Sequence, residues 1–310
     1  MQLRSVLLFP MFTIACGVSF CLHTFVRAEE TVPFPVPVPV PVPAPVPVPV
    51  PVPSTGTTIP TIVAPAPVPA PVPVIESAAD VRPFVRGENF GGYKLSWSDE
   101  FNAEKLDASV WDCRTDSRFW SAQKAENVTV SGGYLHLKLK KEKAGKMDYT
   151  AGGIITKRAF RYGYYEASIK CPPGKGWHTT FSMNQYKSEP TGARQEIDVC
   201  ETDSIDLKAY SVNLQTKKPI HRAFGPRRVK TPDLSGDFHV FGCEFTPQKA
   251  RYFFDGELVS TLDANEFVHD DMSIWISCIG APLAKTFHID DTALPAEVLV
   301  DWVRFYEKSK

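Results

Sequence analysis

The chain has 310 residues, a formal charge of −1 at neutral pH and 43% hydrophobic residues. This length allows one large globular domain or two smaller ones. The near-neutral charge excludes a protein whose surface as a whole attracts polyanions, so we expect no nucleic-acid partner.

Residues 1–28 have the pattern of a targeting segment. Arg4 precedes an uncharged apolar run from about Val6 to Val26, and residues 26–28 resemble a small-residue cleavage site. The run is long for a signal peptide and contains Pro10, so an uncleaved membrane anchor remains a second interpretation. Both interpretations predict a secreted, cell-surface or periplasmic protein, and the second adds a membrane tether.

Residues 29–83 form a Pro-Val-rich segment, with proline at alternate positions over most of residues 31–75. Proline fixes φ and removes a backbone donor, which excludes both a helix and the interior of a sheet. We therefore expect a disordered stalk of extended polyproline II, rising about 3.1 Å per residue. Residues 84–310 remain for a single globular domain.

The sequence of residues 84–310 is typical of short strands. Residues 134–140 alternate leucine with polar residues, and residues 298–306 have the pattern of a buried strand. Asp255-Gly256 lies between two apolar runs and predicts a hairpin with a type I′ turn. We find no helical period longer than two turns, so the pattern predicts an all-β sandwich.

Five cysteines follow the targeting segment: Cys113, Cys171, Cys200, Cys243 and Cys278. An odd number leaves at least one thiol that is free or pairs between molecules. The absence of a C-x-x-C spacing argues against a zinc or redox site. We expect Cys200 to point into the core.

Three carboxylates lie within six residues of one strand-like stretch, at Glu196, Asp198 and Glu201. The first two are two positions apart and share a face of a regular strand. Glu201 is five positions from Glu196 and would point to the opposite face. A β-bulge near Val199-Cys200 would turn all three acids to one side.

Two carboxyl groups on one face are what cleavage of a glycosidic bond commonly requires. A third nearby acid helps to separate their titrations, because adjacent negative charges raise the pKa of one member. We predict that Glu196 is the ionised partner, Glu201 the proton donor, and Asp198 the negative charge between them that holds the nucleophile in place. The alternative is a solvent-facing acidic strand without chemistry.

Five further motifs accompany the acids in order along residues 90–307. They are Leu95–Asn102, Tyr149–Ile154, Phe160–Ala167, Asp237–Gly242 and Val300–Tyr306. Together with the acidic stretch they resemble glycoside hydrolase family 16, the laminarinase and β-glucanase relatives. The resemblance implies a curved β-jelly-roll sandwich of two antiparallel sheets. It also implies a retaining, endo-acting hydrolase of β-linked polysaccharide, a β-1,3-glucan or a related algal or cell-wall glycan, with Glu196 as nucleophile and Glu201 as acid/base.

Two positions depart from the family pattern. A frequent cleft tryptophan is replaced by Ser182, and a frequent histidine aligns with Gln215. These losses keep two alternatives open. One is a carbohydrate-binding protein on the same sandwich without turnover, and the other is a transglycosylase, which shares the covalent intermediate.

We select five residues as substrate-binding candidates: Trp120, Trp177, His178, Arg194 and Gln215. The two tryptophans occupy polar, loop-like contexts, and exposed aromatic rings stack on sugars. The tryptophans in apolar alternation are expected in the core, and they are Trp97, Trp111, Trp275 and Trp302. We expect His178 to be a hydrogen-bonding loop residue rather than a metal ligand.

The sequence predicts no cofactor. The family resemblance weakly implies a structural calcium ion on the convex face, which Asp301 and Glu100 would hold. We expect a monomer with a polysaccharide as its partner.

Overall fold

The structure is a computed structural model, and it describes residues 81–87, 90–185, 194–225, 227–267, 269–281 and 288–309. Residues 1–80, and with them the predicted targeting segment and most of the stalk, lie outside the described residues. Within the described ranges, no helix is long and apolar enough to cross a bilayer.

Two eight-stranded sheets form the domain. Sheet A contains β1 (Tyr93–Asp99), β5 (Val128–Ser131), β6 (Tyr134–Leu139), β9 (Gly163–Lys170), β15 (His239–Phe245), β16 (Lys249–Phe254), β17 (Glu257–Asp263) and β19 (Ala296–Lys308). Sheet B contains β2 (Trp111–Cys113), β8 (Gly153–Phe160), β10 (Trp177–Asn184), β11 (Arg194–Thr202), β12 (Ala209–Lys218), β13 (Arg222–Ala223), β14 (Arg227–Lys230) and β18 (Met272–Gly280). A small third sheet contains β3 (Ser117–Arg118), β4 (Ser121–Gln123) and β7 (Tyr149–Ala151).

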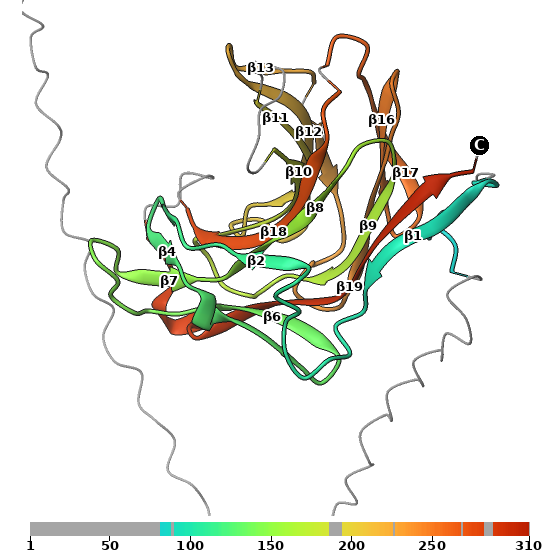
Figure 1. The fold of residues 1–310 in the computed structure, drawn as a ribbon. Helices are drawn as coiled ribbons and strands as arrows, with labels where there is room; N and C mark the ends of the chain where they lie inside the picture. Colours follow the sequence, from blue (N-terminus) through green and yellow to red (C-terminus); the bar gives the residue numbers. More distant parts are fainter. Residues whose placement is uncertain are drawn as a thin grey trace, which may run out of the picture. The chain divides into compact units, whose positions relative to one another are not determined.

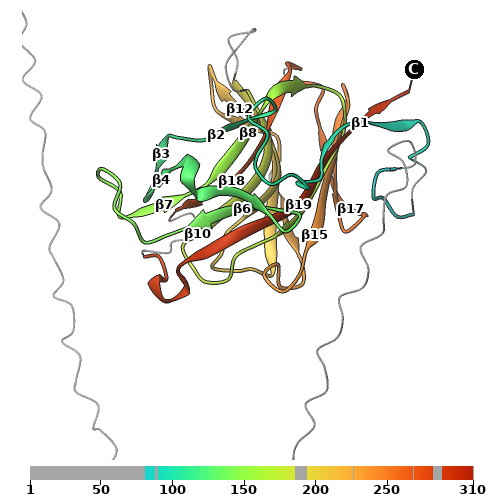
Figure 2. The same cartoon turned by 60° about the horizontal axis from the view of Figure 1, so that its bottom comes forward.

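The strand order places the acidic stretch near the middle of sheet B. That sheet runs β13-β12-β11-β10-β18-β8-β2, with β14 beside β12, and sheet A runs β17-β16-β15-β9-β19-β6-β5, with β1 beside β19. Neighbouring strands in both large sheets are antiparallel, and both sheets are visibly curved (Figures 1 and 2). Apart from two short 3₁₀ turns, η2 (Ala125–Asn127) and η3 (Asp291–Ala293), the described residues contain no helix. The all-β prediction is confirmed.

The core lies between the two sheets and follows the alternation of the strands. The leucines of β6 are fully buried and belong to the same core cluster as Ile197 of β11 and Phe305 of β19. Cys200 is also fully buried in this cluster, as expected. All five described cysteines are free thiols.

Two local predictions are confirmed by the backbone. Asp255 and Gly256 both have positive φ, 48° and 84°, which is the type I′ geometry between β16 and β17. The predicted buried strand over residues 298–306 is the central part of β19.

Residues 81–87 are held against sheet A by a buried carboxylate. Glu166 of β9 accepts hydrogen bonds from the Phe84 backbone N–H (2.9 Å) and the Tyr306 hydroxyl (2.6 Å). The Arg86 N–H donates to the Gly256 carbonyl at 2.8 Å. The segment that enters the domain is therefore fixed by hydrogen bonds before β1 begins.

Candidate active site

Strand β11 contains the bulge that is needed to bring its three acids to one face. Phe181 of β10 pairs with Cys200, whereas the next residue, Ser182, pairs with Asp198, so Val199 is an extra residue. The pairing of β11 with β12 is irregular over the same stretch. An extra residue reverses the alternation of the side chains beyond it. The predicted bulge is confirmed.

The bulge brings the three acids to one face of sheet B. Glu196, Asp198 and Glu201 pair with every second residue of β10. Those partners are Asn184, Ser182 and Thr180, respectively. Directly paired residues of an antiparallel sheet point to the same side, so the acids share a face. That face is turned away from the core, into which the intervening Ile197 points.

Asp198 is the buried member of the trio. Its Oδ2 accepts a hydrogen bond from Gln215 Nε2 at 2.6 Å, and among the described residues its Oδ1 has no hydrogen-bond partner. Burial, and then the nearby charge of Glu201, raise the pKa of Asp198 well above its ordinary range. Burial therefore favours the protonated, neutral form of Asp198 over the ionised form.

Glu196 is held by donors on both oxygens. Asn184 Nδ2 donates to Oε1 at 2.9 Å, and Gln215 Nε2 donates to Oε2 at 3.2 Å. Lys217 of β12 forms an ion pair with Oε2. These contacts favour the ionised form of Glu196, which a nucleophile requires.

Glu201 is the most accessible of the three acids, with 30% of its side chain exposed. His178 Nε2 lies 3.4 Å from its Oε1, and His178 Nδ1 lies 2.8 Å from the Thr202 carbonyl oxygen. His178 is 8% exposed and lies in β10, not in a loop. The expected hydrogen bond is present, but the expected loop is wrong.

Gln215 connects the acids to a histidine. Its amide donates to both Glu196 and Asp198, as described above, and its Oε1 lies 3.0 Å from His221 Nε2. Because an amide oxygen only accepts, His221 donates in this contact. The position that departs from the family pattern thus bridges two acids directly.

A cluster of cations surrounds the Glu196 end of the acid face. Burial, with smaller contributions from Arg118 and Arg194, lowers the pKa of Lys217 to about 8. Arg194, a predicted binding residue, is half-buried at the start of β11. Lys217 could have been found from the sequence, because it follows Gln215 by two positions and so shares its face.

The prediction that Trp177 contacts the sugar is wrong. It is 2% exposed and belongs to the core cluster, because it alternates with His178 on β10 and points to the opposite face. Trp120 is half-buried against the core, and its backbone N–H donates to the Gly280 carbonyl at 3.1 Å. Substrate contact by Trp120 stays a prediction.

The prediction that Trp275 lies in the core is wrong. It pairs with Ser182 across β18 and β10, which places it half-buried on the acid face. The guanidinium carbon of Arg114 lies 5.3 Å from the centroid of its ring. Ser273 and Ser277 flank Trp275 at two-residue spacing, and this polar alternation was the signal that the sequence offered.

Asp301 and Glu100 do not fit a calcium ion. Both carboxylate oxygens of Glu100 are bound by Arg304, at 2.9 and 2.8 Å. The described part of the chain contains no group of three or more acidic, histidine or cysteine side chains suited to a metal.

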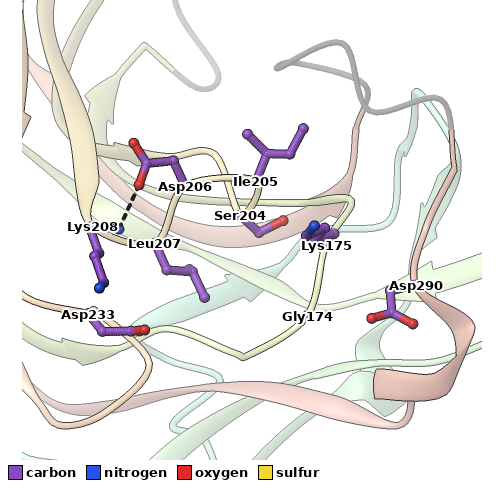
Figure 3. Close-up of a pocket in the computed structure, with 9 residues that line it drawn as sticks. All are labelled: Gly174, Lys175, Ser204, Ile205, Asp206, Leu207, Lys208, Asp233 and Asp290. Atoms are coloured by element: carbon purple, nitrogen blue, oxygen red, sulfur yellow. Dashed lines mark hydrogen bonds between the residues drawn. The ribbon is translucent and has the colours of Figure 1, made fainter.

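A separate cavity of about 330 Å³ lies beyond the end of β11 (Figure 3). Some of its polar groups are held by neighbours, since Asp206 accepts from the Lys208 backbone N–H at 3.1 Å and pairs with Arg228 at 2.7 Å. Ser204 Oγ accepts from the Trp177 backbone N–H at 2.8 Å. Asp206 and Ser204 of this cavity are therefore bound to the protein itself.

Comparison with known proteins identifies the family. The model described as "Beta-porphyranase A-D, GH16 domain" matches residues 94–308, which include every strand of the acid face. The chain belongs to glycoside hydrolase family 16. This family 16 protein is therefore a glycoside hydrolase, and its family supports endo-acting cleavage of a β-linked glycan.

Two curated relatives and one solved structure show the range of this similarity. A β-glucanase of Rhodothermus marinus is 28% identical over 255 residues, covering 71% of this chain and 87% of the relative. A κ-carrageenase of Pseudoalteromonas carrageenovora is 28% identical over 223 residues, covering 58% of this chain and 53% of the relative. The structure of SCLam, a non-specific endo-β-1,3(4)-glucanase from family GH16, has a TM-score of 0.62 at 24% identity and covers 70% of this chain and 92% of its own. That likeness confirms the curved jelly-roll sandwich expected for a family 16 domain.

Proposed function

We propose that this protein hydrolyses a β-linked polysaccharide internally, with retention of anomeric configuration, through Glu196 and Glu201. The observation that carries the proposal is the bulge at Val199, which brings both glutamates to one face. Without it, Glu201 would point into the core and no pair of acids would flank a substrate.

In the first step, Glu196 attacks the anomeric carbon while Glu201 gives a proton to the leaving oxygen. The bond from carbon to the leaving oxygen breaks, and a covalent bond to Glu196 replaces it. In the second step, water attacks the same carbon, its proton passes to Glu201, and Glu196 is released. Two inversions at one carbon give net retention.

The two glutamates lie on either side of Asp198 along the acid face. Their partners on β10 are four residues apart, so their Cα atoms are about 13 Å apart at the usual rise of a strand. Asp198 lies next to both glutamates, since Gln215 donates to Glu196 and to Asp198 and the charge of Glu201 raises the pKa of Asp198. A retaining pair works with its carboxyl groups about 5 Å apart.

Neutral Asp198 has a separate task in this scheme. A proton on this buried carboxyl removes one negative charge from between two glutamates, which lowers their mutual repulsion. The same proton makes Asp198 a hydrogen-bond donor toward the nucleophile or the sugar.

For the substrate, we favour a galactan that carries anionic groups over a neutral glucan. The cations Lys217, Arg118 and Arg194 gather near Glu196, which supplies one balancing carboxylate. Surplus positive charge beside a catalytic acid favours an anionic ligand. The match to the porphyranase model supports a galactan. A neutral β-glucan is the second candidate, since the Rhodothermus marinus relative is a β-glucanase.

We further propose that the protein acts outside the cytoplasm. A polysaccharide is too large to enter a cell intact, and the apolar N-terminal stretch has the pattern of an export signal or anchor.

The test is hydrolysis of sulfated galactans, carrageenans and laminarin by the wild type and by Glu196→Gln and Glu201→Gln. We expect each variant to lose at least about 10³-fold in kcat/KM, as for loss of a nucleophile or its acid. Proton NMR of the first products should show the β-anomer. Unchanged turnover in Glu196→Gln, or α-products, would refute the proposal.

A further inference from the structure

We infer that His178 is the positioning and proton-holding partner of Glu201. The inference rests on the proposed function, in which Glu201 is the acid/base, and it assigns His178 a task other than sugar contact. It requires that the imidazole be oriented, that its free nitrogen face Glu201, and that the pair hold one proton.

The imidazole is oriented by the backbone. His178 Nδ1 lies 2.8 Å from the Thr202 carbonyl oxygen, which can only accept a hydrogen bond. Nδ1 therefore carries a hydrogen, and the second nitrogen, Nε2, is the one whose protonation can change. Thr202 follows Glu201 directly in β11, so the same strand holds both the acid and the anchor of its partner.

The second nitrogen faces the acid. His178 precedes Thr180 by two residues, and Thr180 pairs with Glu201, so the imidazole lies on the acid face. Nε2 is 3.4 Å from Glu201 Oε1. This distance is longer than a strong hydrogen bond, which leaves the half-exposed carboxyl free to turn toward a leaving oxygen.

The pair can hold one proton in two ways. It is either a carboxylic acid beside neutral imidazole or a carboxylate beside imidazolium. A glutamic acid in water loses its proton far below neutral pH, whereas a histidine in water does so near it. A histidine beside the acid therefore offers a second atom, His178 Nε2, on which the proton for the leaving oxygen can reside.

The pair of Glu201 and His178 gives up one proton and regains one during each catalytic cycle. When the bond to the leaving oxygen breaks, Glu201 transfers the shared proton to that oxygen, which leaves a carboxylate beside neutral His178. When water attacks the covalent intermediate, Glu201 removes one proton from the water. The pair then again holds one proton, and no other reactant is needed.

The experiment compares His178→Gln, His178→Ala and Glu201→Gln on two synthetic substrates. These are the phenyl and 2,4-dinitrophenyl glycosides of the disaccharide that the wild type releases from its polysaccharide. Phenolate leaves poorly without a proton, whereas dinitrophenolate leaves readily without one. We expect His178→Gln to lose about 10–100-fold in kcat/KM on the phenyl glycoside and less than about 3-fold on the dinitrophenyl glycoside.

The controls separate the possible outcomes. His136→Gln, on β6 of sheet A, replaces a histidine whose contacts are Ser131 and Glu297, and should leave both rates unchanged. Equal losses on both substrates, or none, in both His178 variants would overturn the inference if Glu201→Gln remains sensitive to the leaving group. Insensitivity of Glu201→Gln would overturn the proposed function as well.

Discussion

Asp198 shows how burial can assign a role to one carboxyl among three. It lies between two glutamates on the same face, yet it alone is fully buried. Burial disfavours its charged form, while the donors on Glu196 favour a charge there. The sequence predicted Asp198 as a negative charge beside the nucleophile, whereas its raised pKa indicates a neutral acid.

Replacing Asp198 with asparagine should stabilise the protein above acidic pH. The folded-state pKa of Asp198 is raised, so the wild type loses stability as pH rises above the unfolded value of about 4. Asparagine keeps the shape and an acceptor for Gln215 but does not ionise. We expect Asp198→Asn to melt several degrees higher than the wild type at pH 7, with the gap closing toward pH 4. A gap independent of pH would contradict the neutral assignment.

Lys217 should govern the choice between charged and neutral substrates. Lys217→Met keeps most of the apolar stem and removes the cation that pairs with Glu196. We expect kcat/KM to fall on both polysaccharides, because the ion pair supports the ionised nucleophile, and to fall about tenfold further on a sulfated galactan than on laminarin, equivalent to about 1.4 kcal/mol. Lys249→Met, an exposed position on β16, is the control. Equal effects on both polysaccharides would remove the argument for an anionic substrate.

The tryptophans show where the alternation of apolar and polar residues predicts burial and where the residues two positions away must also be considered. Trp111 is 2% exposed, as the apolar pattern predicted. Trp275 lies between two isoleucines, and its direction is settled by the serines two positions away on each side. Trp177 opens β10, so only knowledge of where that strand starts assigns its face.

At the scale of single elements, the bulge could be predicted because the proposed catalysis needs the acids on one face, whereas their odd spacing in a regular strand would place them on two. Three acids of a catalytic motif must converge, and a regular strand cannot turn Glu196 and Glu201 to one side. The donors around them could not be predicted in the same way. Asn184 reaches Glu196 through strand pairing, and His221 reaches Gln215 across the pairing of β12 with β13; neither lies in the motif.

Sheet A also contains a buried carboxylate with a raised pKa, that of Glu166. Burial raises its pKa to about 7, and it accepts from Phe84 N–H and from Tyr306. Glu166→Ala would leave both donors without this partner, at a cost of about 1–3 kcal/mol for each buried group.

This substitution should release residues 81–87 without affecting catalysis. We expect trypsin to cut after Arg86 faster in Glu166→Ala than in the wild type, while kcat/KM is retained because the acids lie on sheet B. Glu297→Ala, which removes a half-exposed partner of His136, should leave the cleavage rate unchanged. Equal protection in both variants would show that Glu166 does not hold the segment.

At the scale of the whole molecule, the fold class could be predicted from periodicity, turn residues and the absence of helical patterns. The strand order could not, because β9 lies between β15 and β19, which are distant in sequence. Residues far apart along the chain, such as Ser182 and Trp275, therefore meet on the acid face only through topology. The other residues of the site are brought together by strand pairing, whereas the three acids all lie on the single strand β11.

The most direct test of the central claim is to trap the covalent intermediate. The wild type would be incubated with an activated 2-deoxy-2-fluoro glycoside of its product disaccharide, which slows the second step more than the first. After trypsin digestion, mass spectrometry with fragmentation of the 195–208 peptide would locate the sugar. We predict a single glycosyl group on Glu196. A label on Glu201 or Asp198, or no label during turnover that yields α-products, would contradict the account.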